Sequence, residues 1–168
     1  MQNFIAEVCI GASALRGQGG SGLIQCCRDF FKRIDFSKIP MEQKEFAVWL
    51  ETNTEELRAT FPKVARNYGA ARKALNLFLR DASYNVILNR AYDLDRLLPL
   101  LEVPVDSFTA NHLHKYEPSI ILKKWDSLKR VKDTELKKYQ EAAQLLAEKW
   151  GINRVDLDAF FYREKLED

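Results

Sequence analysis

The chain has 168 residues, of which 46% are hydrophobic and 30% charged, and its 26 basic and 24 acidic groups leave a net charge of only +2. A chain of this length fits one compact domain, and so small a net charge does not by itself indicate a polyanionic partner. Three cysteines, two of them adjacent, cannot all pair and lack the spacing of a zinc or iron–sulfur site, so we expect reduced thiols in a cytoplasmic protein.

Apolar residues recur at helical spacing, and the few glycines and prolines fall between the runs, which predicts an all-α, compact multi-helix bundle. A first helix or half-buried segment is expected over 1–14. Its apolar run 4–10 contains Glu7 and is too short to cross a bilayer, so we expect no membrane contact. After a glycine cluster, Ser21 is positioned to cap a second helix. The apolar side of that helix is Leu23, Cys27, Phe30, Phe31 and Ile34.

The glycine cluster at 17–22 fits the dinucleotide-binding pattern G-x-G-x-x-G literally. No convincing strand precedes it and no βαβ unit follows it, although that context is what makes the pattern bind a dinucleotide. The sequence therefore favours a turn between helices over a nucleotide site.

Helical spacing continues through the middle of the chain. A third helix follows Pro40, and Thr52 with Glu55 has the form of a capping box that opens a fourth helix, which Pro62 ends. The densest helical signal covers 68–82. Its apolar stripe is Ala71, Leu75, Phe78 and Ala82, and its polar stripe is Arg72, Asn76 and Arg80.

Three further helices are expected at 85–91, 94–101 and 155–165. Pro104 begins a turn into another helix, which Asp106 is positioned to cap. Asp133 or Thr134 opens a long helix that Gly151 closes. We find no internal repeat or linker, and we expect one helical domain over 1–168 that is monomeric.

Positive charge is concentrated in two stretches. Residues 63–90 hold six basic groups against Asp81 alone, a local charge of +5, and residues 115–138 hold eight basic and four acidic groups, a local charge of +4. If the fold brings the two stretches together, they form a surface for phosphate groups. The alternative is two solvated helix faces.

The segment Leu-Glu-Val-Pro-Val-Asp-Ser-Phe-Thr at 101–109 resembles the catalytic-aspartate segment of the helix-hairpin-helix DNA glycosylase superfamily. Lys73, in the segment 69–76, precedes Asp106 by 33 residues, an interval similar to that of archaeal-type 8-oxoguanine DNA glycosylases. The resemblance covers about 60–115, the glycosylase-like core, to which 133–166 would add closing helices. The Leu-Pro-Gly-Val-Gly hairpin of the superfamily is absent, and Phe108 stands where many relatives carry a polar residue.

This resemblance implies a DNA glycosylase with AP lyase activity, in which Lys73 is the nucleophile and Asp106 the catalytic carboxylate. A neutral amine attacks the anomeric carbon of deoxyribose and forms a Schiff base, while the carboxylate stabilises the cationic sugar. The implied substrate is double-stranded DNA that contains an oxidised purine such as 8-oxoguanine, and no cofactor or metal is expected. The alternative is a noncatalytic DNA-binding or protein-interaction helical domain that has lost this chemistry.

Further candidates follow from the same resemblance. A glycosylase extrudes its base into a pocket with apolar walls and polar groups that bind the base edge. The expected pocket residues are Asp158, Phe161, Tyr162 and Trp49. The expected contacts to DNA phosphates are Arg66, Arg72 and Arg80. Aromatic residues at helical spacing also suit a core, and the arginines also suit a solvated surface.

Overall fold

The computed structural model describes residues 1–11, 14–19 and 21–167, and all regular structure in these ranges is helical, which confirms the predicted all-α class. The α-helices are α1 (Gln2–Val8), α2 (Leu23–Phe31), α3 (Gln43–Thr60), α4 (Tyr68–Tyr84), α5 (Val86–Tyr92), α6 (Ser107–Tyr116), α7 (Asp133–Trp150) and α8 (Leu157–Glu167). Short 3-10 turns are η1 (Phe36–Lys38), η2 (Lys63–Ala65), η3 (Leu94–Leu97) and η4 (Arg154–Asp156).

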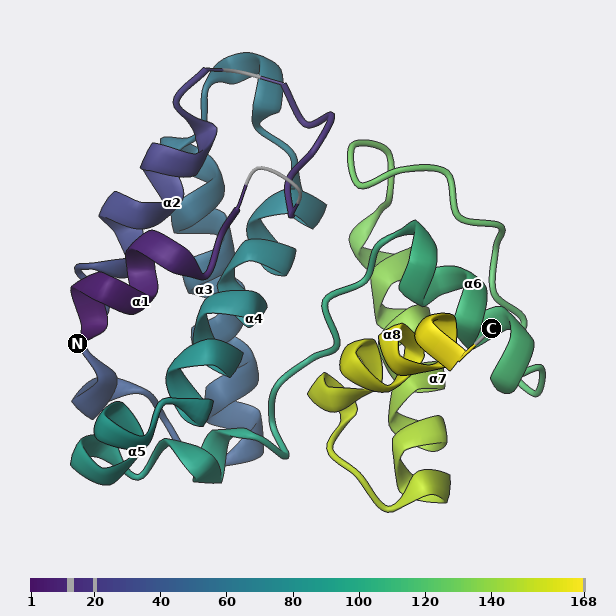
Figure 1. The fold of residues 1–168 in the computed structure, drawn as a ribbon. Helices are drawn as coiled ribbons and strands as arrows, with labels where there is room; N and C mark the ends of the chain where they lie inside the picture. Colours follow the sequence, from purple (N-terminus) through teal and green to yellow (C-terminus); the bar gives the residue numbers. More distant parts are fainter. Residues whose placement is uncertain (12–13, 20, 168) are drawn as a thin grey trace.

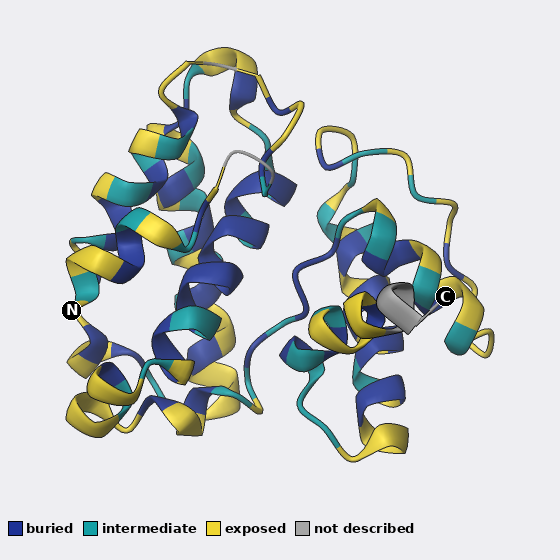
Figure 2. Ribbon diagram, in the orientation of Figure 1, coloured by how far each residue is buried: buried dark blue, intermediate teal, exposed yellow. Residues whose placement is uncertain are grey.

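The helices gather in two lobes, which Figure 1 shows side by side. The first lobe holds α1 to α5 and the second holds α6 to α8. An extended segment, 101–106, connects them. Each lobe has its own hydrophobic cluster, and the chain passes from the first cluster at Leu101 to the second at Val103. Buried residues line the inner faces of both lobes in Figure 2.

Helix α4 lies at the centre of the molecule. The predicted apolar stripe is fully buried, and Phe78 stacks on Phe31 of α2 with ring centroids 4.4 Å apart. The predicted polar stripe is not a solvated face, because Asn76 is only 1% exposed. The apolar stripe faces the first core, whereas Arg72 and Arg80 of the polar stripe reach residues of the connecting segment and of α8.

Helix α3 is one continuous helix, so the predicted break at Thr52 is wrong. The Thr52 hydroxyl donates to the carbonyl of Val48 one turn earlier, which a helix interior accommodates. The observed cap is Glu42, whose carboxylate accepts from the backbone N–H groups of Lys44 and Glu45. Pro62 follows the helix end, as predicted.

Other helix ends differ less from the positions that the sequence predicts. Ser21 is not the cap of α2, because Gly22 takes that position with a φ of 91° that favours glycine. The expected helix at 94–101 is only the 3-10 turn η3. Helix α1 ends at Val8, and residues 12 and 13 of the expected first segment lie outside the described residues.

Asp106 caps α6 and Gly151 ends α7 in the left-handed conformation, as the sequence predicts. The three cysteines are free, and burial raises the pKa of Cys9 and of Cys27 to about 12. Within the described ranges, no helix combines the length and the apolar character needed to cross a membrane.

Candidate active site

Lys73 and Asp106 meet between the two lobes. The Lys73 amine on α4 donates to Oδ2 of Asp106 at 2.8 Å. The lysine side chain is 8% exposed, whereas the aspartate side chain is 32% exposed. The structure thus holds the amine in a sheltered position and leaves its carboxylate partner accessible to solvent.

The position of Asp106 before α6 explains why its carboxylate stays ionised. Its Oδ1 accepts from the backbone N–H groups of Phe108 at 2.9 Å and Thr109 at 3.1 Å, at the positive end of the helix. Burial raises the pKa of Asp106, but the Lys73 ammonium and these N–H donors outweigh it, so the pKa lies below its usual value.

Asp158 lies beside the pair, at the start of α8. Its carboxylate accepts from Arg80 at 3.1 Å and from the Thr109 hydroxyl at 3.5 Å. Burial raises the pKa of Asp158; Arg80 opposes the rise, and the Asp106 carboxylate adds to it. The site therefore contains two carboxyl groups whose environments move their pKa values in opposite directions.

The three aromatic pocket candidates occupy different places. Tyr162 is exposed, and its ring lies 4.9 Å from that of Phe108, close to the N-terminus of α6. Phe161 is fully buried and packs in the second hydrophobic cluster, so it is a core residue. Trp49 stacks on Phe46 of the same helix and lines a separate hollow on the first lobe. Burial of apolar area accounts for both of these packed positions.

Two of the three predicted phosphate-binding arginines are held by carboxylates. Arg72 is 13% exposed, and its Nε and Nη2 donate to the two oxygens of Glu102 at 2.7 and 2.8 Å. Arg80 pairs with Asp81 and Asp158. Only Arg66 among the three is exposed. The local charge of +5 computed along the sequence is therefore partly neutralised in the folded chain.

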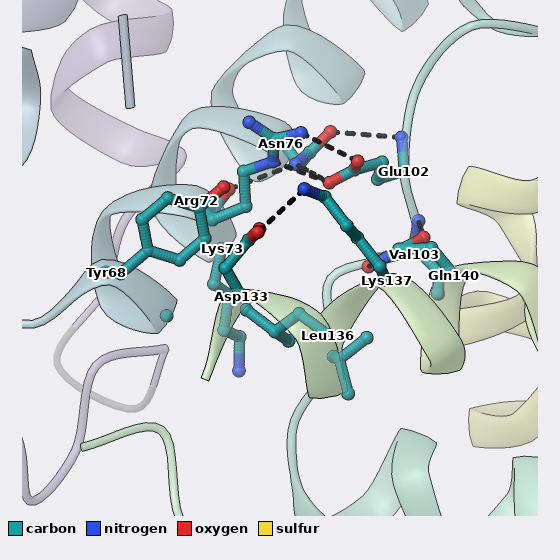
Figure 3. A pocket seen from close by; sticks show the side chains of 12 residues that line it. Tyr68, Arg72, Lys73, Asn76, Glu102, Val103, Asp133, Leu136, Lys137 and Gln140 are labelled. Carbon is teal, nitrogen blue, oxygen red and sulfur yellow. Dashed lines mark hydrogen bonds and ion pairs between the residues drawn. The ribbon is translucent and has the colours of Figure 1, made fainter. Parts of the chain in front are cut away.

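A small hollow adjoins the stem of Lys73 between α4 and α7. It has a volume of about 30 Å³ and is lined in part by Tyr68, Arg72, Glu102 and Leu136 (Figure 3). This volume holds about one water molecule, far less than a purine base requires. A base would therefore have to approach the pair from the exposed side of Asp106.

The two basic stretches come together at the start of α4. A Cβ added to Gly69 at the start of α4 would lie 2.8 Å from the carbonyl of Leu128, and one added to Gly19 would lie 3.8 Å from the Lys129 amine. Asn67 donates to Gln18 of the glycine loop at 3.2 Å. We call five exposed cations of these segments the basic rim: Arg16, Arg66, Lys124, Lys129 and Lys132. In the part of the chain that the structure describes, the basic rim forms no ion pair within 4.0 Å.

This arrangement can support nucleophilic chemistry on a polyanionic ligand. It supplies an amine, a carboxylate within proton-transfer distance and a second carboxyl group, and the exposed cations of the basic rim lie near the start of the helix that carries the amine. No protein-family model, curated protein or solved structure matches the chain. The family expected from the sequence therefore stays a prediction.

Proposed function

We propose that the protein is a DNA glycosylase with AP lyase activity that excises an oxidised purine through a Schiff base on Lys73. The observation that carries this proposal is the 2.8 Å contact between the sheltered Lys73 amine and the Asp106 carboxylate. Residues far apart in the sequence supply the pair, and the pairing brings together the two groups that the chemistry requires.

The contact has a direct role in the proposed reaction. Asp106 accepts a proton from the Lys73 ammonium, and the neutral amine then attacks the anomeric carbon of deoxyribose. The new carbon–nitrogen bond forms as the glycosidic bond breaks, and the bonding electrons leave with the base. The base takes up the proton that Asp106 received from Lys73, so Asp106 is ionised again. The nitrogen bound to the sugar then gives up a proton to the ring oxygen as the ring opens, which yields the Schiff base. The ionised Asp106 stabilises the positive charge that develops on the sugar.

Two further features favour a DNA substrate with a damaged base. Unpaired cations of the basic rim suit phosphate groups, because their neutralisation releases counterions. Asp158 lies beside the pair, and its carboxyl oxygens can accept a hydrogen bond from a base edge. Proximity to Lys73 and Asp106 makes Asp158 the strongest candidate among the predicted pocket residues.

Borohydride trapping tests this proposal. The protein is incubated with duplexes that carry different oxidised purines, and sodium borohydride reduces any Schiff base to a stable covalent complex. Trapping is expected for wild type and for Lys44→Gln, a matched change at an exposed lysine of α3. Lys73→Gln should abolish trapping while its circular dichroism spectrum stays unchanged. Absence of trapping by wild type across the lesion panel would contradict the proposal.

A second candidate is a noncatalytic DNA-binding domain. The observation that favours it is the basic rim, whose five cations need no contribution from Lys73 or Asp106. This function predicts salt-dependent binding to undamaged duplex with no release of a base, and Asp106→Asn should leave that binding unchanged.

A further inference from the structure

The connecting segment has no regular structure, yet side chains from both lobes hold its backbone. Asn76 of α4 accepts the N–H of Glu102 at 3.0 Å. The Gln140 amide of α7 forms two bonds to Val103, accepting from its N–H at 3.1 Å and donating to its carbonyl at 2.8 Å. Arg154 donates to the carbonyl of Leu101 at 3.1 Å. Three successive residues are thus fixed by side chains rather than by a helix or sheet.

Ion pairing at Glu102 strengthens the same attachment. Both of its carboxylate oxygens accept from Arg72, and Asn76 donates to one of them at 3.3 Å. Figure 3 shows these three side chains joined by dashed lines beside the hollow. Burial raises the pKa of Glu102, but Arg72 outweighs it and keeps the carboxylate ionised. A bidentate arginine contact fixes orientation as well as distance.

The sequence positions of these residues connect the attachment to the candidate active site. Arg72 and Asn76 lie on α4 on either side of Lys73, one and three residues away. Glu102 and Val103 precede Asp106 by four and three residues, and 101–106 has no regular secondary structure. The helix that carries the amine therefore also holds the segment that carries the carboxylate.

We propose that Arg72, Asn76, Glu102 and Gln140 are positioning residues that set the Asp106 carboxylate opposite the Lys73 amine. We call these four residues the interlobe clamp. They act through the backbone of Leu101–Val103 and not through contact with a substrate. Loss of part of the clamp lets the segment shift, and a displacement of about 1 Å at a reacting group can lower a rate about 100-fold. The expected loss of activity rests on the proposed function, whereas the positioning of Asp106 does not.

A measurement without DNA tests the positioning itself. The ionisation of Asp106 is followed by NMR of the carboxyl carbon, assigned with Asp106→Asn. The charged groups that act on it are Lys73 on α4, Asp158 on α8 and, through Asp158, Arg80. Gln140→Met removes both bonds to Val103 at similar side-chain length. We expect the titration midpoint of Asp106 to rise by about 1 pH unit in this variant, because its ammonium partner is displaced. Glu141→Gln, an exposed change next on α7, should leave the midpoint unchanged.

Glu102→Gln provides a second variant that removes the ion pair, and thermal unfolding shows which variants fold. If Gln140→Met is the only clamp variant that folds, the titration midpoint of Asp106 in that variant decides whether the clamp positions Asp106. Single-turnover trapping then measures the rate, which we expect to fall about 100-fold in folded clamp variants with DNA affinity unchanged. A clamp variant that folds, retains the wild-type midpoint and traps at the wild-type rate overturns the positioning role. A shifted midpoint together with no trapping by wild type supports the clamp and contradicts the glycosylase.

Discussion

Lys73 is a sheltered amine whose counterion is a single, more exposed carboxylate. Its stem lines a hollow with room for about one water, so little solvent is available there to replace Asp106. Loss of the carboxylate would leave a sheltered ammonium group with poor hydration. The charge on Asp106 therefore affects folding stability as well as the proposed chemistry.

Asp106→Asn should destabilise the protein by about 2 kcal/mol at pH 7, the range for a hydrogen bond to a charged group. Asparagine is also a good helix cap, so the stability lost in this variant comes mainly from the charge of the Asp106 carboxylate. The folded-state pKa of Asp106 is lowered, so its contribution is present above the unfolded value of about 3.9 and is lost as the pH falls through the folded value. Urea unfolding of both proteins measures the difference at each pH.

Other titrating groups are common to both proteins, so their effects cancel in this difference. Exposed Asp29, which bonds to Gln25 on α2, provides the control, since Asp29→Asn should give a smaller change. A difference between wild type and Asp106→Asn that stays constant from neutral pH to below pH 3 would show that the carboxylate is not stabilised by charge.

The sequence predicted the residues of the pair but not the partners of their neighbours. Lys73 and Asp106 could be found because each lies in a short segment that resembles a known motif. Arg72 and Arg80 were predicted as phosphate contacts, yet their carboxylate partners lie 30 and 78 residues away, at Glu102 and Asp158. Local charge counts omit such partners, because ion pairs form across the fold. Gln140 carries no sequence signal that could have identified it.

For the helices, the spacing of apolar residues predicted the structure better than capping motifs did. The stripe of α4 was predicted correctly because apolar burial imposes a strict period on a central helix. The predicted break within α3 was wrong because threonine followed by glutamate three residues later also fits a helix interior, where the Thr52 hydroxyl bonds to Val48. The spacing also predicted the polar stripe of α4 but not its burial, since a one-helix pattern cannot reveal a second lobe that covers it.

The first turn of α4 packs tightly against the chain before α7. A Cβ at Gly69 would lie 2.8 Å from the Leu128 carbonyl and 2.9 Å from a Val131 methyl group. Gly69→Ala should therefore destabilise the protein by about 1 to 3 kcal/mol through overpacking, against the higher helix propensity of alanine. Hydrogen exchange should also become faster at 127–131. Thermal unfolding measures the loss of stability, and mass spectrometry measures the exchange.

The companion change Val131→Ala removes one of the two close approaches. The double variant should recover part of the stability that Gly69→Ala removes, because the approach to Val131 is then relieved and only the approaches to Leu128 remain. If Gly69→Ala were more stable than wild type with unchanged exchange at 127–131, the close packing of this turn on α4 would be refuted.

Across the whole molecule, positive charge is divided between groups paired with carboxylates between the lobes and exposed groups of the basic rim. Lys73, Arg72 and Arg80 are neutralised by carboxylates, whereas the basic rim stays exposed. The net charge of +2 therefore conceals a surface on which several cations are available to one ligand. Phosphate binding by this surface would be governed by counterion release.

Duplex binding should depend on salt through the basic rim. The combined variant Lys124→Gln, Lys129→Gln and Lys132→Gln should reduce the slope of log K against log salt by about 0.9 for each phosphate that the protein no longer neutralises. Fluorescence anisotropy with an undamaged duplex gives the slope. Lys44→Gln, at the start of α3, should leave it unchanged. Equal slopes for the triple variant and wild type would exclude the basic rim as the DNA-binding surface.

The division into two hydrophobic clusters also has a consequence for biosynthesis. Chains emerge from the ribosome N-terminal end first, so the first cluster, all of whose residues except Val155 precede residue 102, can largely form before Glu102, Asp106 and α7 emerge. At that stage Arg72, Lys73 and Asn76 lack Glu102, Asp106 and the amide of Gln140. The nascent polypeptide would thus carry a hydrated lysine without its aspartate, and the pair would form only after Asp106 has emerged.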